Sequence, residues 1–133
     1  MTTANPTVWL TLKAHDAPAL IDYYVRTFGF VLSARYGEGD TVDHAQLVWP
    51  EGSGGIMLGS HRPDTVWSRE PGTAGAYVVT ADPDALYERV LQHDADILRP
   101  LAKTDYGSRE FSVRDPEGNL WSFGDYAGEE QAG

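Results

Sequence analysis

The stretch from Asp16 to Phe30 reads D-A-P-A-L-I-D-Y-Y-V-R-T-F-G-F, and a related stretch begins 66 residues later at Asp82. In both copies an aspartate precedes an apolar stripe with helical spacing, the pattern of a capped amphipathic helix. Because a proline-containing turn also keeps this offset, the sequence predicts that a whole supersecondary unit is duplicated. The matching positions are Asp16 and Asp82, Ala19 and Ala85, Leu20 and Leu86, and the turns Pro50-Glu51-Gly52 and Pro116-Glu117-Gly118.

The length and composition of the chain are those of one globular domain. It has 133 residues, 41% hydrophobic and 23% charged, enough for a hydrophobic core without disulfides. The chain has no cysteine, which excludes thiolate catalysis and thiolate metal sites. The N-terminus shows no basic and apolar leader, and no apolar run approaches the roughly 18 residues of a membrane span. We therefore expect a cytoplasmic protein without a membrane partner.

The chain is acidic, with a formal net charge of −10 and a pI near 4.6. Nucleic-acid binding needs a basic face, so nucleic acid is excluded as a partner. A positively charged ligand is favoured electrostatically. The alternative is that the acidic charge only increases the solubility of the protein.

Hydrophobic patterning and turn residues predict the same order of elements in each half. Module 1 covers about 7–60 and module 2 about 74–125, separated by a linker at 61–73 and followed by a polar tail at 126–133. The fold class is therefore α+β, with two tandem β-α-β-β-β modules in a single domain, 1–133. The expected strands cover 8–14, 30–36, 42–49, 56–60, 75–80, 97–100, 110–114 and 120–124, and the expected helices cover 17–28 and 83–93.

Three stretches resemble one protein family. Residues 16–30 are similar to the first-helix signature of the vicinal oxygen chelate superfamily, and residues 82–90 to its counterpart in the second half. Residues 106–123, Y-G-S-R-E-F-S-V-R-D-P-E-G-N-L-W-S-F, resemble the closing hairpin of glyoxalases and bleomycin-resistance proteins. The resemblance covers about residues 8–125. It implies paired modules that form a curled mixed sheet with a cleft, and a homodimer with clefts at or near its interface.

Members of this family are of two kinds, namely metal enzymes and metal-free proteins that sequester a cytotoxic compound. Four positions hold the metal in the glyoxalase I pattern, and the resemblance places them at Trp9, Met57, Ala76 (or Gly75) and Ser122. Tryptophan, alanine and glycine side chains do not bind a metal, and methionine or serine suits a divalent ion poorly. The sequence therefore predicts no metal site and no cofactor.

Strand alternation predicts which side chains line the cleft. If Ala45 and Phe111 pack against the helices, then His44 and Glu110, which share the 66-residue offset, face the cleft. There they could act as acid and base or anchor a cationic ligand; the alternative is that both lie in water at strand ends. The other expected ligand contacts are Trp9, Thr11, Lys13, Gln46, Met57, Ser112 and Ser122, with Ala76 and Val78 in the remaining walls.

Two functions with a small-molecule partner follow from this cleft. The first is a metal-free protein that binds a cationic or aromatic antibiotic-like compound, with Trp9 either stacking on the ligand or filling the space. The second is a lyase- or isomerase-type enzyme that uses His44 and Glu110 as acid and base, or a divalent metal on unrecognised ligands. A structural or regulatory member, whose cleft is filled by its own side chains, is a third alternative.

Overall fold

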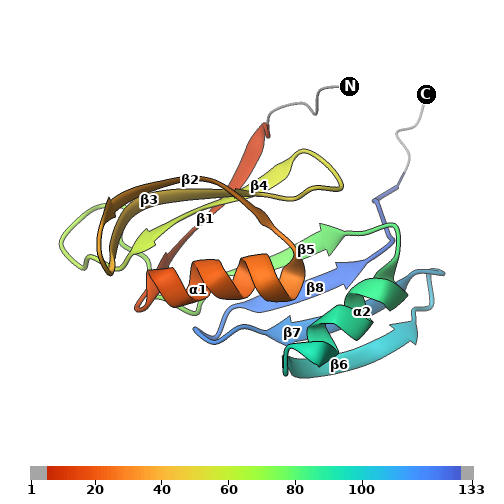
Figure 1. The fold of residues 1–133 in the computed structure, drawn as a ribbon. Coiled ribbons are helices and arrows are strands. Elements are labelled where there is room, and N and C mark those ends of the chain that lie inside the picture. Colours follow the sequence, from red (N-terminus) through yellow and green to blue (C-terminus); the bar gives the residue numbers. More distant parts are fainter. Residues whose placement is uncertain (1–5, 130–133) are drawn as a thin grey trace.

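The chain folds into two similar halves, each with one sheet and one main helix (Figure 1). The computed structural model describes residues 6–129, so residues 130–133 of the expected tail lie outside the described residues. The first half contains β1 (Val8–Ala14), α1 (Ala17–Tyr23), η1 (Tyr24–Phe28), β2 (Val31–Glu38), β3 (Thr41–Val48) and β4 (Gly54–Ser60). The second half contains β5 (Gly75–Val79), α2 (Pro83–Gln92), β6 (Asp96–Lys103), β7 (Arg109–Arg114) and β8 (Leu120–Gly124).

Each half forms its own four-stranded mixed sheet. The first sheet has the order β1-β4-β3-β2, and the second has the order β5-β8-β7-β6. In both sheets the first strand pairs in parallel with the last, and the other pairs are antiparallel. The α+β class and the two β-α-β-β-β modules are therefore confirmed.

Both α-helices begin at the aspartates that the repeat marks. The Asp16 carboxylate accepts a hydrogen bond from the Ala19 amide at 3.2 Å, and Asp82 accepts the equivalent bond from Ala85 at 3.0 Å. Each carboxylate satisfies an amide that has no partner within its helix, so these contacts fix where the helices start.

The helix expected at 17–28 changes its winding part of the way along. It is α-helical to Tyr23 and continues as a π-helical turn, η1, that ends at Gly29. The amides of Gly29 and Phe30 both donate to the Tyr24 carbonyl, which is the wider hydrogen-bonding pattern of such a turn. Across residues 6–129, no helix is long and apolar enough to cross a membrane.

Several strands extend beyond their expected ranges, β6 and β4 among them. β6 covers Asp96–Lys103 with two irregularities in its pairing with β7, where only 97–100 was expected. β4 begins at Gly54 rather than at Ile56 because both glycines before Ile56 pair with β1. Gly55 lies opposite Trp9, and a Cβ at Gly55 would lie 2.6 Å from the indole. Glycine is therefore needed for the Trp9 ring to cross β4.

One hydrophobic core is shared by both sheets. The ring centroids of Phe28 and Phe123 lie 4.8 Å apart, and those of Phe30 and Trp121 lie 5.8 Å apart, which joins the two modules. Ala45 and Phe111 are fully buried in this core, as the alternation predicted. Because both sheets bury one face in the same core, their other faces point away from it.

Asp115 is a buried carboxylate in the turn before β8. Its Oδ2 accepts hydrogen bonds from the Tyr24 hydroxyl at 2.5 Å and from the side-chain nitrogens of Asn119 and Trp121 at 3.0 Å each. Its Oδ1 accepts the backbone amides of residues 117–119. Burial and the neighbouring Asp115 raise the pKa of Tyr24 well above its usual range, so the hydroxyl stays a donor. The closing turn thus joins module 2 to the helix of module 1.

Candidate ligand-binding site

The outer face of the first sheet carries the expected contacts of module 1. These side chains alternate with buried ones along three strands and are half-buried or exposed. The register places Met57 between Thr11 on β1 and Gln46 on β3. We call this surface the first-sheet face; it consists of Trp9, Thr11, Lys13, His44, Gln46 and Met57.

A groove of about 250 Å³ lies on the first-sheet face. Its lining combines Lys13, His44 and Met57 of the sheet with Trp67 and Arg69 of the linker. The Trp67 side chain is 76% exposed, so its indole is accessible for stacking on a planar molecule. The groove therefore has apolar and aromatic walls, with the cations Lys13 and Arg69 and the carboxylate of Asp43 beside them.

His44 is held by two neighbours on the first-sheet face. Its Nε2 atom lies 3.0 Å from the amide nitrogen of Gln46, and its ring stacks on Tyr36 with centroids 6.4 Å apart. The two contacts fix the orientation of the imidazole ring on this face. The adjacent Asp43 binds Arg62 at 2.5 Å, and within residues 6–129 no carboxylate forms an ion pair with His44.

The outer face of the second sheet is polar. Here Glu110 is buried, with only 7% of its surface exposed. The hydroxyls of Tyr77 and Tyr106 donate to its two carboxylate oxygens at 2.7 and 2.6 Å. A Cβ at Gly124 would collide with the Tyr77 hydroxyl and with Glu110, so glycine is needed for these side chains to meet. We call this surface the second-sheet face; it consists of Tyr77, Arg99, Tyr106, Glu110, Ser112 and Ser122.

The Glu110 carboxylate is held in its ionised form. Burial is the largest influence and would raise its pKa. The hydrogen bonds from Tyr106, Tyr77 and Ser108, with the nearby charge of Arg99, outweigh burial and bring the pKa below the ordinary 4.5. Burial and the bond to Glu110 raise the pKa of Tyr77 to about 12. Glu110 is therefore a fixed anion and a weak base near neutral pH.

Arg99 and two serines continue the polar surface beside Glu110. The Arg99 guanidinium donates to Ser112 Oγ at 3.2 and 3.0 Å, and Ser112 Oγ lies 2.8 Å from Ser122 Oγ. In the described part of the chain Arg99 forms no ion pair. The second-sheet face thus offers a ligand a cation, an anion and hydroxyl groups.

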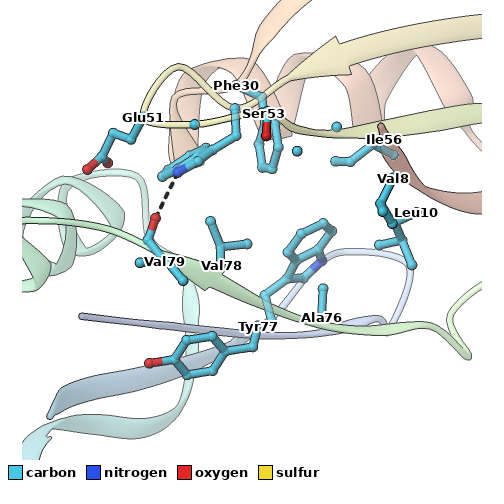
Figure 2. Close-up of a pocket in the computed structure, with 15 residues that line it drawn as sticks. Val8, Leu10, Phe30, Glu51, Ser53, Ile56, Ala76, Tyr77, Val78 and Val79 are labelled. Carbon is cyan, nitrogen blue, oxygen red and sulfur yellow. Dashed lines mark hydrogen bonds between the residues drawn. The ribbon is translucent and has the colours of Figure 1, made fainter. Parts of the chain in front are cut away.

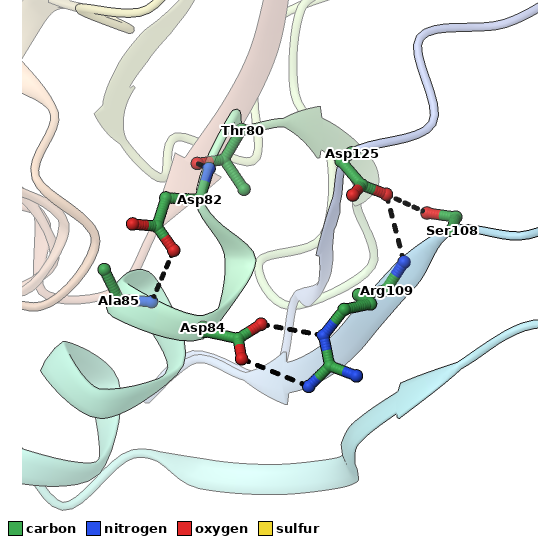
Figure 3. A network of polar contacts seen from close by, with 7 residues as sticks. All are labelled: Thr80, Asp82, Asp84, Ala85, Ser108, Arg109 and Asp125. Carbon is green, nitrogen blue, oxygen red and sulfur yellow. Dashed lines mark hydrogen bonds and ion pairs between the residues drawn. The ribbon is translucent and has the colours of Figure 1, made fainter.

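The strand that carries Glu110 is fixed at its start by two acidic side chains (Figure 3). Asp84 of α2 binds the Arg109 guanidinium at 2.8 and 3.2 Å. Asp125 accepts the Ser108 hydroxyl at 2.8 Å and the Arg109 amide at 3.0 Å. The Ser108 bond is the main cause of the lowered pKa of Asp125. These contacts hold β7 against α2 and the chain after β8, and so position Glu110.

The structure brings the expected site residues together as two groups. His44 lies with Gln46 and the rest of the first-sheet face, whereas Glu110 lies with Ser112 and Ser122 on the second-sheet face. The two faces point away from the same core, and no hydrogen bond between residues 6–129 joins His44 to Glu110. Within one chain, each face is therefore half of the expected cleft.

The prediction that Ala76 and Val78 face the cleft is wrong, because the alternation along β5 is displaced by one residue. Both side chains lie on the core side of β5, where they line a cavity that opens between the two sheets. Tyr77 occupies the outer face instead, because β5 and β8 pair with Tyr77 opposite Ser122. The repeat contained the signal, since the residue 66 positions after Thr11 is Tyr77. Tyr106 and Trp67 lie outside the strands that the repeat relates, so no such signal identified them. Arg99 lies on β6, 66 positions after Ser33 of β2, so the repeat did mark its position.

The four positions of the glyoxalase metal pattern do not form a metal centre. Trp9 and Met57 offer an indole and a thioether, Ser122 is hydrogen-bonded to a serine, and Ala76 faces the interior. Within residues 6–129, no group of three or more histidine, aspartate or glutamate residues is arranged to hold a metal ion. The side chains at these positions do not fit a divalent ion.

Comparisons with known proteins agree on the fold. TioX from Micromonospora sp. ML1 superposes with a TM-score of 0.76 at 32% identity, covering 91% of this chain and 97% of TioX. TnmS3, an antibiotic binding protein from Streptomyces sp. CB03234, superposes with a TM-score of 0.71 at 21% identity, covering 92% and 96%. A comparison with curated proteins found no match. The model of the Glyoxalase/Bleomycin resistance protein/Dioxygenase superfamily matches residues 8–123, and the chain belongs to this superfamily.

Proposed function

We propose that the protein binds a planar aromatic antibiotic-like molecule without changing it chemically, acting by sequestration. The observation that carries this proposal is the groove on the first-sheet face, which is lined by the exposed indole of Trp67 together with Met57 and His44. An indole, a thioether and an imidazole all make favourable contacts with an aromatic ring. The similarity to TnmS3, an antibiotic binding protein, supports the same class of ligand.

The charges around the two faces define which polar groups a ligand would carry. Lys13 and Arg69 at the groove favour an acceptor such as a carbonyl or phenolate. Glu110 on the second-sheet face favours a cation or a hydrogen-bond donor, in line with the net charge of −10. We propose a ligand that combines an aromatic ring system with both kinds of group.

The full cleft in this proposal is built by a homodimer. Because the first-sheet and second-sheet faces point away from one core, a single chain cannot enclose a ligand between them. In a two-fold dimer the first-sheet face of one protomer can lie opposite the second-sheet face of its partner. His44 and Glu110 would then face one ligand from two chains, in the cytoplasm.

Glu110 serves in this proposal as a fixed anion rather than as a catalytic base. Its lowered pKa makes it a weak proton acceptor, and both of its oxygens already accept tyrosine hydroxyls. The Nε2 atom of His44 is likewise engaged by Gln46. These contacts suit groups that orient a ligand better than groups that exchange protons with it.

Isothermal titration calorimetry with bleomycin and a panel of planar aromatic antibiotics tests the proposal. We expect saturable binding by at least one compound and recovery of the compound unchanged. Trp67→Ala should weaken binding at least tenfold, whereas Val66→Ala, at the neighbouring exposed position, should not. The absence of binding across the panel, unchanged affinity of Trp67→Ala, or chemical turnover of a bound compound would each contradict it.

A further inference from the structure

A second cavity lies between the two sheets, on the core side of the strands (Figure 2). Its volume is about 370 Å³, a size usual for small-molecule sites. Leu10 and Ile56 of module 1 line one side, and Ala76 and Val78 of module 2 line the other. The cavity opens to solvent, because Val8 and Val79 at its edge are exposed, and an accessible apolar hollow of this kind is typical of a binding site.

Three aromatic side chains, Phe30, Trp49 and Trp121, form a large part of the wall. The Trp49 indole donates its N–H to the Val79 carbonyl at 2.9 Å, and the Trp121 indole donates to Asp115 at 3.0 Å. Because both indole N–H groups are already used, the two rings present only apolar surface to the cavity.

Polar groups are confined to the mouth of the cavity. Glu51 accepts the Thr80 hydroxyl and the Ala81 amide at 2.8 Å each, and its carboxylate is turned away from the cavity in Figure 2. The Tyr77 hydroxyl is directed to Glu110 on the second-sheet face. A charged ligand would lose its hydration in the cavity without gaining a partner.

We infer that this cavity is a second binding site, which takes an uncharged aromatic molecule with at most one polar substituent, directed to Ser53 at the mouth. It shares no lining residue with the groove on the first-sheet face. The inference therefore does not depend on the proposed antibiotic binding. Each chain has two separate sites, and the site between the two sheets selects against charge.

Binding of the neutral dye N-phenyl-1-naphthylamine tests this site, read as dye fluorescence and as energy transfer from tryptophan. The blocking variant is Gly54→Leu. Gly54 lies on the same side of β4 as Ile56, and a Cβ there meets no atom within 4 Å, so the new side chain enters the cavity without displacing its wall. Ala76→Phe fills the cavity from the opposite side. Thr41→Leu adds similar bulk at an exposed strand position as the matched control.

We expect one dye per wild-type chain, at least tenfold weaker binding by both filling variants, and unchanged binding by Thr41→Leu. Thermal melts establish that each variant is folded. If neither filling variant folds, the site is tested by NMR on the wild-type chain with bound dye. Nuclear Overhauser effects between the dye and the methyl groups of Ile56 and Val78 support the site. Contacts to the Met57 methyl group alone, equal affinity of the filling variants, or no saturable binding by the wild type would overturn it.

Discussion

Glu51 and Glu117 each accept hydrogen bonds from the module to which the other glutamate belongs. Each lies in the turn before the last strand of its own module, and each binds the strand–helix corner of the other module. Glu117 accepts the amides of His15 and Asp16 at 3.0 and 2.8 Å. Glu51 accepts the Thr80 hydroxyl and the Ala81 amide, at positions related to Ala14 and His15 by the 66-residue offset. The repeated Pro-Glu-Gly turn therefore links the two modules reciprocally.

Removal of either glutamate should destabilise the fold at the module interface. Glu117→Ala leaves two amides at the start of α1 without their carboxylate, and we expect a loss of about 1–2 kcal/mol in the free energy of unfolding. Glu51→Ala should have a similar effect because it removes the equivalent pair of bonds. Urea unfolding of both variants measures this loss. An unchanged midpoint for both would show that the turns do not link the modules energetically.

Asp115→Ala should be far more damaging. It leaves the buried Tyr24 hydroxyl and the Trp121 N–H without acceptors and removes the carboxylate from the backbone of the turn. We expect a loss of about 3–5 kcal/mol, or failure to fold. Asp64→Ala, at an exposed linker position, is the control and should lie within about 0.5 kcal/mol of the wild type. Thermal melts compare the two, and equal stability would contradict a structural role for Asp115.

Gly124→Ala should separate Tyr77 from Glu110. The new Cβ would occupy the space in which the Tyr77 hydroxyl meets the carboxylate. We expect the pKa of Tyr77 to move from about 12 toward its ordinary value of 10.0. Ultraviolet titration of tyrosinate, with Tyr77→Phe as the reference that lacks this group, measures the shift. A titration curve identical to that of the wild type would contradict the prediction.

Glu110 should make the stability of the protein sensitive to acid. Its pKa is lower in the folded chain than the ordinary 4.5, so its ionised form stabilises the fold above that pH. This stabilisation should be lost as the pH falls below about 4.5 and passes through the folded pKa. The stability difference between the wild type and Glu110→Gln should therefore shrink between pH 7 and pH 3. A carbon NMR titration of the Glu110 carboxyl with a midpoint at or above 4.5 would contradict this.

The repeat predicted the fold because it consists of local sequence features, namely helix caps and strand alternation. Asp16 and Asp82 cap their helices through contacts within three residues, and strand alternation sends Ala45 and Phe111 into the core. Alternation predicts the wrong face for Ala76 and Val78, because both are apolar enough for either face of β5 and only the pairing with β8 decides. Trp67 and Tyr106 belong to segments without a repeating pattern, so their places in the site depend on how those segments pack.

By itself, the sequence determined the duplicated α+β modules, the residue types at the family's metal positions such as Trp9 and Ser122, and the side chains that share the first-sheet face. These depend on residue type and on periods of two and 3.6 residues, which are local properties. Only the tertiary structure decided that the two sheets bury one common core, which places His44 and Glu110 on faces that point apart. That arrangement arises from long-range contacts such as Phe28 with Phe123 and Tyr24 with Asp115, and no local pattern encodes which modules pack together.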